Sequence, residues 1–246
     1  MKLKDQPRLV IFAKAPQAGL AKTRLIPALG AEGAAALARR MLEHTLQQAL
    51  AASAGPVELC MSPAPDDPAW QGMALPDAVA RSAQGEGDLG QRMARAVQRV
   101  TTEQRQPLLL LGADCPGLTA AHLSEAAAQL AQHDAVLLPV ADGGYVLIGL
   151  KAPCPELFTQ MPWSTSAVAA ETLRRMAALG LRVWQGPQLH DIDEAADLAQ
   201  LPAGFTAEKQ FHSPPGRVGA AQAGIPIKQA SSPISTRASS YQLHSR

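Results

Sequence analysis

The chain contains few cysteines, and they lie far apart. Its 246 residues include three of them, Cys60, Cys115 and Cys154, and no C-x-x-C pair occurs. This usage gives no sign of a zinc site or of dithiol redox chemistry. We therefore expect a protein of the reducing cytoplasm.

Long apolar runs and blocks of like charge are also missing. No stretch approaches the roughly 18 consecutive apolar residues of a membrane-spanning helix, and the segment Met1 to Pro7 is short and polar. The formal net charge is +1, and no cluster of Lys and Arg stands out. We therefore expect a soluble, unexported protein whose partners include neither a membrane nor a nucleic acid.

Short apolar runs alternate with segments of strong helix formers. Strands are predicted at 9–13, 57–61, 78–83, 108–111, 135–140, 145–150 and 181–185. Helices are predicted at 31–52, in a segment that ends near 102, at 119–132 and at 165–179, with a last short helix through Leu198 and Leu201. This alternation is typical of an α/β domain with a mainly parallel sheet and helices on both faces.

Two further features complete the predicted organisation. Asp142-Gly143-Gly144 predicts a tight turn that returns the strand starting at Tyr145 as an antiparallel hairpin. Beyond the domain at 1–203, residues 204–246 are rich in Pro, Gly, Ser and Gln without apolar periodicity, so we expect a disordered tail.

One predicted strand ends in a carboxylate. Leu108 to Leu111 lead into Gly112-Ala113-Asp114, and in an open parallel sheet this end of a strand faces the ligand crevice. An ionised Asp there needs a cation, a donor or water, and we favour a divalent cation carrying a nucleotide. The simpler interpretation is that Asp114 caps the helix that follows.

A second acidic cluster, Asp191, Asp193 and Glu194, also follows a strand. Two carboxylates that meet across a crevice match the hard oxygen ligands of Mg²⁺, although sequence spacing leaves open whether they meet. The nearby His190, like Cys115, has no partner placed to make it a base or a nucleophile, so we assign both to structure.

The loop after the first strand is basic. It places Lys14, Lys22, Thr23 and Arg24 where side chains and backbone amides can surround phosphate oxygens. A P-loop is excluded, because G-x-x-x-x-G-K-[ST] needs two glycines with Lys directly after the second, whereas Gly19 stands alone. The alternative is a solvated turn with exposed cations.

Glycines mark two further segments. Gln84 to Gly90 contains three of them, which implies close backbone approach or unusual φ angles. The pair Gly143-Gly144 suits either a plain hairpin turn or close approach of a substrate. Trp163-Ser164-Thr165 predicts the start of a helix, with Trp163 lining the site.

As a set, these segments resemble the DUF2064 family, also named radical-SAM/selenodomain-associated transferase 1 or glycosyltransferase-A-like. The resemblance covers about residues 8–201 and rests on motifs in one order: 13–25, Gly87-Asp88-Leu89-Gly90, 112–116, 142–145, 163–165 and 191–193. It implies the Rossmann-like glycosyltransferase-A fold of the nucleotide-diphospho-sugar transferases. It also implies kinship with sugar-1-phosphate nucleotidyltransferases and phospholactate guanylyltransferases.

The resemblance also implies roles for individual residues. The ligands of a triphosphate become Lys22 and Arg24, with Lys14 and Thr23 beside them, and the base is held by Gln84, Gly87, Asp88 and Gly90. Mg²⁺ or Mn²⁺ is held by Asp114 and Asp193. The acceptor is faced by Asp142, Gly143, Gly144, Tyr145 and Trp163.

The expected function is therefore a Mg²⁺-dependent transferase that uses a nucleoside triphosphate or a nucleotide sugar. Nucleotidyl transfer to a small phosphorylated acceptor, with Lys22, Arg24 and Asp114 as catalytic residues, is preferred. Alternatives are a glycosyltransferase with a nucleotide-sugar donor and a non-catalytic nucleotide-sensing or interaction module. The base, the acceptor, the oligomeric state and the role of the tail stay open.

Overall fold

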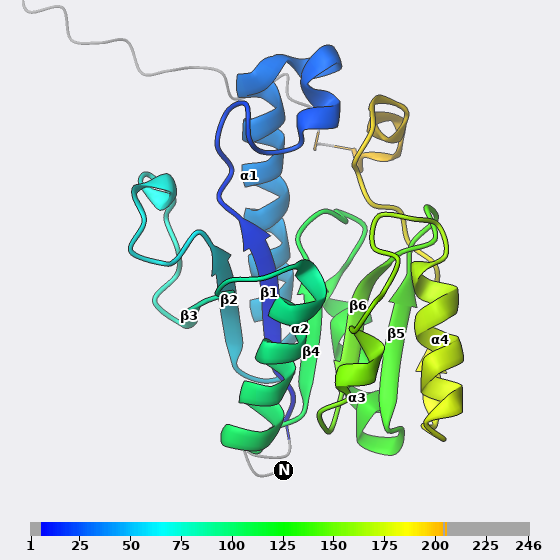
Figure 1. The fold of residues 1–246 in the computed structure, drawn as a ribbon. Helices are drawn as coiled ribbons and strands as arrows, with labels where there is room; N and C mark the ends of the chain where they lie inside the picture. The colour runs from blue at the N-terminus through cyan, green and yellow to red at the C-terminus, as the bar shows by residue number, and fades with distance from the viewer. Residues whose placement is uncertain (1–5, 204, 206–246) are drawn as a thin grey trace, which may run out of the picture. The chain divides into compact units, whose positions relative to one another are not determined.

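The computed structural model describes residues 6–203 and 205, so the predicted tail over 204–246 lies outside the described residues except for Phe205. Within them, the strands form one sheet in the order β3-β2-β1-β4-β6-β5-β7 (Figure 1). Its members are β1 (Arg8–Lys14), β2 (Val57–Ser62), β3 (Val79–Ala83), β4 (Leu108–Gly112), β5 (Ala135–Pro139), β6 (Tyr145–Leu150) and β7 (Val183–Gln185). All the strands predicted from apolar runs are confirmed.

The hairpin predicted at the Asp142 turn is also confirmed. β6 runs antiparallel to β5, with Leu150 opposite Ala135. β6 also pairs antiparallel with β4, with Leu150 opposite Leu108. The hairpin strand therefore lies inside the sheet between β4 and β5, which the order of the strands along the chain did not predict. The remaining strand pairs are parallel.

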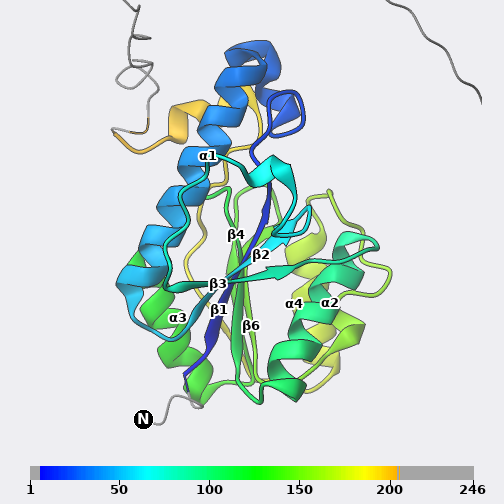
Figure 2. The ribbon, with the colours of Figure 1, turned by 90° about the vertical axis from the view of Figure 1, so that its left-hand side faces the viewer.

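Helices cover both faces of the sheet, as expected. They are α1 (Ile26–Ala52), α2 (Leu89–Gln98), α3 (Ala120–Gln132) and α4 (Val168–Ala178). Figure 2 shows α1 and α3 on one face and α2 and α4 on the other. Along β1, Leu9 and Ile11 pack with the α1 and α3 side, whereas Val10 packs with the α2 and α4 side. Burial on both faces explains why the central strands are apolar at consecutive positions.

The helix ends follow local signals. Thr119 is the N-cap of α3 and forms a capping box with His122. Gly180 follows α4 with a φ of +69°. α1 begins earlier than predicted, at Ile26, but Gly30 interrupts it with a φ of +71°, so its regular part starts near the predicted position. No helix in the described part of the chain is both long and apolar enough to cross a membrane.

α4 starts later than predicted, at Val168 instead of Thr165. Ser164 adopts a left-handed backbone conformation with a φ of +63°. The Thr165 hydroxyl donates to the carbonyl of Pro162 at 2.8 Å. These two features hold the preceding residues in a turn, so the helix cannot extend back to them.

The parallel strands end at one edge of the sheet, the upper edge in Figure 1. The basic loop follows β1, the glycine-rich loop follows β3, Asp114 follows β4, and the second acidic cluster follows β7. The turn at Asp142 lies at the same edge, because it joins the end of β5 to the start of β6. The topology therefore gathers the predicted site segments on the side where open α/β sheets bind ligands.

Candidate functional site

Lys22 joins the two predicted metal-binding carboxylates. Its Nζ lies 3.1 Å from Asp114 Oδ2 and 3.4 Å from Asp193 Oδ1. The Lys22 side chain is 7% exposed, whereas those of Asp114 and Asp193 are 57% and 41% exposed. The two acidic segments therefore meet. The helix-cap interpretation of Asp114 is wrong, because Thr119 is the N-cap of α3.

Arg24 extends this ion-pair network. Its Nη1 lies 2.7 Å from Asp193 Oδ2 and 3.7 Å from Glu194 Oε1. Lys14, at the end of β1, and Thr23 are exposed at the same edge. The two cations predicted to bind phosphates are thus paired with the predicted acidic cluster.

The second acidic segment is fixed by its backbone. Ile192 N donates to Asp114 O at 2.9 Å, and the fully buried Ile192 side chain packs with residues of α1 and Leu25. Asp197 Oδ2 accepts from Asp193 N at 3.0 Å and from Glu194 N at 2.7 Å. Sequence reasoning missed Asp197, although Glu194 followed three positions later by an acidic residue is a capping-box signal.

The backbone of Lys22 is left-handed, with φ and ψ both at 48°. This conformation is uncommon for a residue with a long side chain. It is held by Leu25, whose amide donates to Lys22 O at 2.8 Å and whose side chain is fully buried. The loop therefore presents Lys22 from an anchored turn.

The Asp191 side chain is partly buried. Burial raises the pKa of its carboxyl above the usual value, the Asp142 carboxylate adds to this effect, and Lys22 opposes it. The Asp142 turn is thus electrostatically coupled to the acidic segment. Burial also raises the pKa of the Cys115 thiol to about 11, so the thiol stays protonated at neutral pH, in agreement with a structural role.

The glycine-rich loop is tied to the sheet and to α2. Gln84 is buried, and its Nε2 donates to Ala13 O at 3.1 Å and to Cys60 O at 3.0 Å. The Asp88 carboxylate accepts from Gln91 N at 2.8 Å and forms a capping box at the start of α2. Both side chains are therefore engaged in contacts within the protein.

Two arginines that sequence reasoning missed hold this loop. Arg92 Nε donates to Gly87 O at 2.7 Å. Arg95 donates to Gln84 O at 2.6 Å and to Glu86 O at 2.8 Å. Their position in the helix directly after the loop was the available signal, since side chains in the first turns of α2 lie beside the loop that precedes it.

Trp163 lies beside the start of α2. A Cβ added to Gly90 would meet Phe158 O at 2.4 Å and Trp163 Nε1 at 3.1 Å. Only glycine therefore fits at this position of α2. The structure brings Trp163, predicted to face the acceptor, against Gly90, predicted to face the nucleotide base.

The glycines of the Asp142 turn meet structural needs. Asp142 Oδ1 accepts from Gly144 N at 2.7 Å, as in an ordinary turn. Gly143 has a φ of +90°, and an added Cβ would lie 2.1 Å from Ser166 O. Its carbonyl accepts from Ala169 N at 2.8 Å, so the turn is docked against the start of α4.

Tyr145 packs on the face of the sheet that α2 and α4 cover. Burial raises the pKa of its hydroxyl far above the usual value, and the neighbouring Thr172 hydroxyl acts in the opposite direction. Tyr145 therefore stays protonated at neutral pH.

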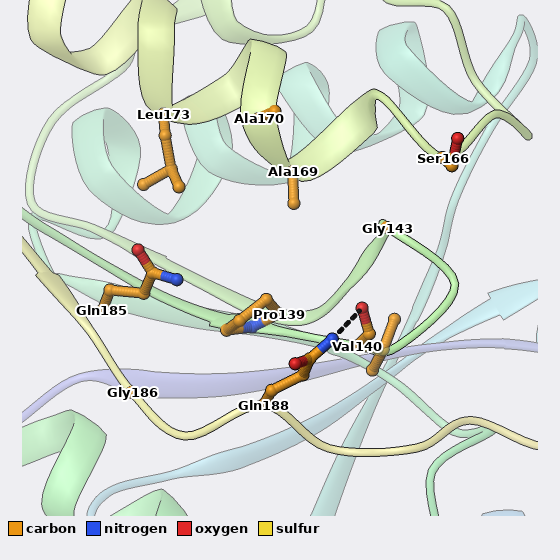
Figure 3. Close-up of a pocket in the computed structure, with 10 residues that line it drawn as sticks. All are labelled: Pro139, Val140, Gly143, Ser166, Ala169, Ala170, Leu173, Gln185, Gly186 and Gln188. Carbon is orange, nitrogen blue, oxygen red and sulfur yellow. Dashed lines mark hydrogen bonds between the residues drawn. The ribbon is translucent and has the colours of Figure 1, made fainter.

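A cavity of about 330 Å³ opens beside the Asp142 turn (Figure 3). It lies between α4 and the segment after β7, with Gly143, Ser166 and Leu173 among its lining residues. Gln185 and Gln188 supply amide groups, and Gln188 Nε2 donates to Val140 O at 3.4 Å. None of the residues that line it is charged. The cavity therefore suits an uncharged group.

Residues 45–165 match DUF2064, described as an uncharacterized protein family conserved in bacteria. This match confirms the resemblance to DUF2064. No curated protein matches the chain.

Solved structures match this chain over most of its length. A protein from Desulfovibrio desulfuricans G20 described as a candidate nucleotide-diphospho-sugar transferase is 29% identical, with a TM-score of 0.75, over 85% of this chain and 92% of that chain. A nucleotidyl transferase from Methanothermobacter is 18% identical, with a TM-score of 0.53, over 81% of this chain and 97% of that chain. Rv0371c from Mycobacterium tuberculosis H37Rv, in complex with manganese, is 16% identical, with a TM-score of 0.51, over 80% and 97%. The predicted glycosyltransferase-A-like α/β fold class is confirmed.

Proposed function

We propose that this protein is a transferase that uses a nucleoside triphosphate or a nucleotide sugar, with Mg²⁺ or Mn²⁺ as cofactor. The observation that carries the proposal is the meeting of Lys22 and Arg24 with Asp114 and Asp193 at the ligand-binding edge of the sheet. The similarity to a candidate nucleotide-diphospho-sugar transferase supports the same class.

Asp114 and Asp193 fit a divalent cation because both carboxylates already approach a single cationic atom, Lys22 Nζ. Mg²⁺ is commonly held by one or two carboxylates together with substrate phosphates and water. In the described part of the chain, no group of three or more His, Cys, Asp or Glu side chains could hold a metal alone. Phosphate oxygens would therefore complete the coordination. When bound, the ion would neutralise charge on the phosphates.

Nucleotidyl transfer to a small phosphorylated acceptor is the preferred reaction. A phosphate oxygen of the acceptor forms a bond to the α-phosphorus, while the bond from that phosphorus to pyrophosphate breaks and pyrophosphate leaves with the electron pair. Lys22 and Arg24 donate hydrogen bonds to the phosphate oxygens on which charge develops. The acceptor phosphate is already ionised, so no protein base has to remove a proton.

The surrounding segments supply the remaining contacts of this proposal. Lys14 and Thr23 flank the phosphates, and the loop from Gln84 through Gly87 and Asp88 to Gly90 borders the base. The turn from Asp142 to Tyr145 borders the acceptor. The uncharged cavity beside Gly143 supports an acceptor with an uncharged portion, and Trp163 borders the α2 side of the site.

The second candidate is glycosyl transfer from a nucleotide sugar at the same site, which the 29% identity to a candidate nucleotide-diphospho-sugar transferase favours. In that reaction, Lys22 and Arg24 would steady the departing nucleoside diphosphate instead of pyrophosphate.

A turnover assay distinguishes the candidates. The purified protein is incubated with each nucleoside triphosphate and a panel of sugar phosphates in the presence of Mg²⁺, and pyrophosphate release is measured. We expect acceptor-dependent pyrophosphate release with at least one triphosphate. Hydrolysis of a nucleotide sugar without reaction of any triphosphate would favour glycosyl transfer, and inactivity in both assays despite nucleotide binding would indicate a non-catalytic module.

A further inference from the structure

The cations and the carboxylates of the site are paired with one another. Lys22 contacts Asp114 and Asp193, and Arg24 contacts Asp193 and Glu194. The carboxylates proposed to hold the metal are thus the partners of the cations proposed to hold the phosphates. When no ligand is bound, these cations and carboxylates therefore form ion pairs with each other.

The Lys22 ammonium contacts both Asp114 and Asp193, and its side chain is better shielded from water than that of Arg24. The Lys22 side chain is 7% exposed, whereas that of Arg24 is 60% exposed. A partly buried ion pair is screened by water and salt far less than an exposed one. The ammonium of Lys22 is therefore a strong competitor for any cation that enters between Asp114 and Asp193.

Neither a divalent cation alone nor a triphosphate alone fits the charges of this site. A divalent cation would meet the like charge of Lys22 at the position it must occupy. A triphosphate would meet the carboxylates of Asp114, Asp193 and Glu194 while it approached Lys22 and Arg24. In both cases a like charge within a few ångströms opposes binding.

A divalent cation and a triphosphate that bind together fit the charges of the site. If Lys22 turns from the carboxylates to the phosphate, the metal replaces its charge between Asp114 and Asp193. Asp114 and Asp193 then share the metal in place of Lys22, and the phosphate gains a cation. A change of partner by one flexible side chain is sufficient, because Lys22 is presented from a turn whose backbone is anchored by Leu25.

We propose that Lys22 acts as a built-in cation that occupies the metal position until a phosphate ligand withdraws it, so that metal and nucleotide each raise the affinity for the other. This inference rests on the proposed function, since it takes Asp114 and Asp193 as metal ligands and Lys22 as a phosphate ligand. Because binding free energies are linked, the enhancement is the same in both directions.

The test measures binding of Mn²⁺ and of inorganic tripolyphosphate, a probe that carries no base, to the intact chain by calorimetry. Chelation of Mn²⁺ by tripolyphosphate in solution is measured separately and subtracted. We expect tripolyphosphate to raise the affinity of the wild-type protein for Mn²⁺ about tenfold or more.

Lys22→Met gives effects of opposite sign on the two ligands. Mn²⁺ alone binds about tenfold more tightly, because the competing ammonium is gone, and tripolyphosphate binds about tenfold more weakly, because a charged hydrogen bond is lost. The mutual enhancement of Mn²⁺ and tripolyphosphate binding becomes smaller than in the wild type. Lys22→Gln, which keeps a polar side chain, is measured in parallel, and circular dichroism of both variants is compared with the wild type.

Lys151→Met is the matched control. It removes the same charge at the opposite edge of the sheet, where Lys151 follows β6 and donates to Ala131 O. We expect no change in the binding of either probe.

A folded Lys22→Met or Lys22→Gln variant whose affinity for Mn²⁺ is unchanged or lower would overturn the inference. Equal Mn²⁺ affinity with and without tripolyphosphate in the wild type would also overturn it, while the turnover assay could still establish the transferase. Inactivity in that assay, with the Lys22 effects present, would overturn the transferase and leave the competition between Lys22 and metal standing.

Discussion

Lys22 Nζ lies 3.1 Å from Asp114 Oδ2, although 92 positions separate the two residues in the sequence. The contact joins the loop after β1 to the loop after β4, and these strands are neighbours in the sheet. It defines the centre of the candidate site.

Asp114→Asn tests the metal assignment. The carboxamide keeps the shape of the side chain but loses the negative charge that a hard cation requires. We expect Mg²⁺-dependent nucleotide binding to fall about 100-fold, measured as loss of the nucleotide-induced rise in melting temperature. Asp134→Asn, at the opposite edge of the sheet, is the control. Unchanged Mg²⁺ dependence in Asp114→Asn would remove Asp114 from the metal site.

Gly143→Ala tests the docking of the Asp142 turn on α4. The new Cβ would lie 2.1 Å from Ser166 O at a φ of +90°. Gly180 also has a positive φ, +69°, but no atom lies within 4 Å of an added Cβ. We expect Gly180→Ala to lower the free energy of unfolding by about 1 kcal/mol and Gly143→Ala by about 3 kcal/mol or more, measured by urea denaturation. Equal losses of unfolding free energy in the two variants would show that the turn moves away from Ser166 O without further destabilisation.

Asp88→Ala separates capping from ligand binding. Asp88 and Thr119 are both N-caps with capping boxes, at α2 and α3 respectively. Replacing either by Ala should lower the free energy of unfolding by about 1 kcal/mol. We expect only Asp88→Ala to weaken nucleotide binding as well, since its cap orders the loop beside Gly87. The same nucleotide affinity in both variants would argue against a role of this loop in binding.

Glu58→Gln tests a buried ion-pair network away from the candidate site. Glu58 is 2% exposed and contacts Arg99, Arg8 and the Ser82 hydroxyl. Burial alone would raise the pKa of the Glu58 carboxyl, but Arg99, Ser82 and Arg8 hold it below the usual value of 4.5. We expect the substitution to lower the free energy of unfolding at pH 7 by about 3 kcal/mol.

The pH dependence of that loss has a definite sign. The folded pKa of Glu58 is lower than the unfolded pKa, so the ionised carboxylate stabilises the fold above pH 4.5, and this stabilisation is lost as the pH falls through the folded value. The difference between wild type and Glu58→Gln in urea denaturation should therefore narrow below pH 4.5. Glu32→Gln, at an exposed position of α1, should show no difference at either pH. If the difference in unfolding free energy between wild type and Glu58→Gln does not change with pH, the destabilisation comes from altered packing.

Much of the fold could be predicted from the sequence because its signals are local. Consecutive apolar residues define strands such as Leu108–Leu111, the hydroxyl of Thr119 caps a helix, and Asp142-Gly143-Gly144 makes a turn. The insertion of β6 between β4 and β5 could not be predicted, because the runs that form those strands are all apolar and do not specify which pairs with which. The contact of Trp163 with Gly90 could not be predicted either, because the path of a loop depends on the packing of its side chains.

The sequence by itself determined where the charged residues and the conformationally permissive glycines lie, and which strand ends they follow. Residue type and local periodicity do not depend on distant contacts. Only the tertiary structure decided that Asp114 and Asp193 both contact Lys22, since parallel strands set the distances between loops that are remote in sequence. The structure also decided that Gln84 and Asp88 have structural partners. Burial and hydrogen bonding are properties of the packed chain, and no local pattern contains them.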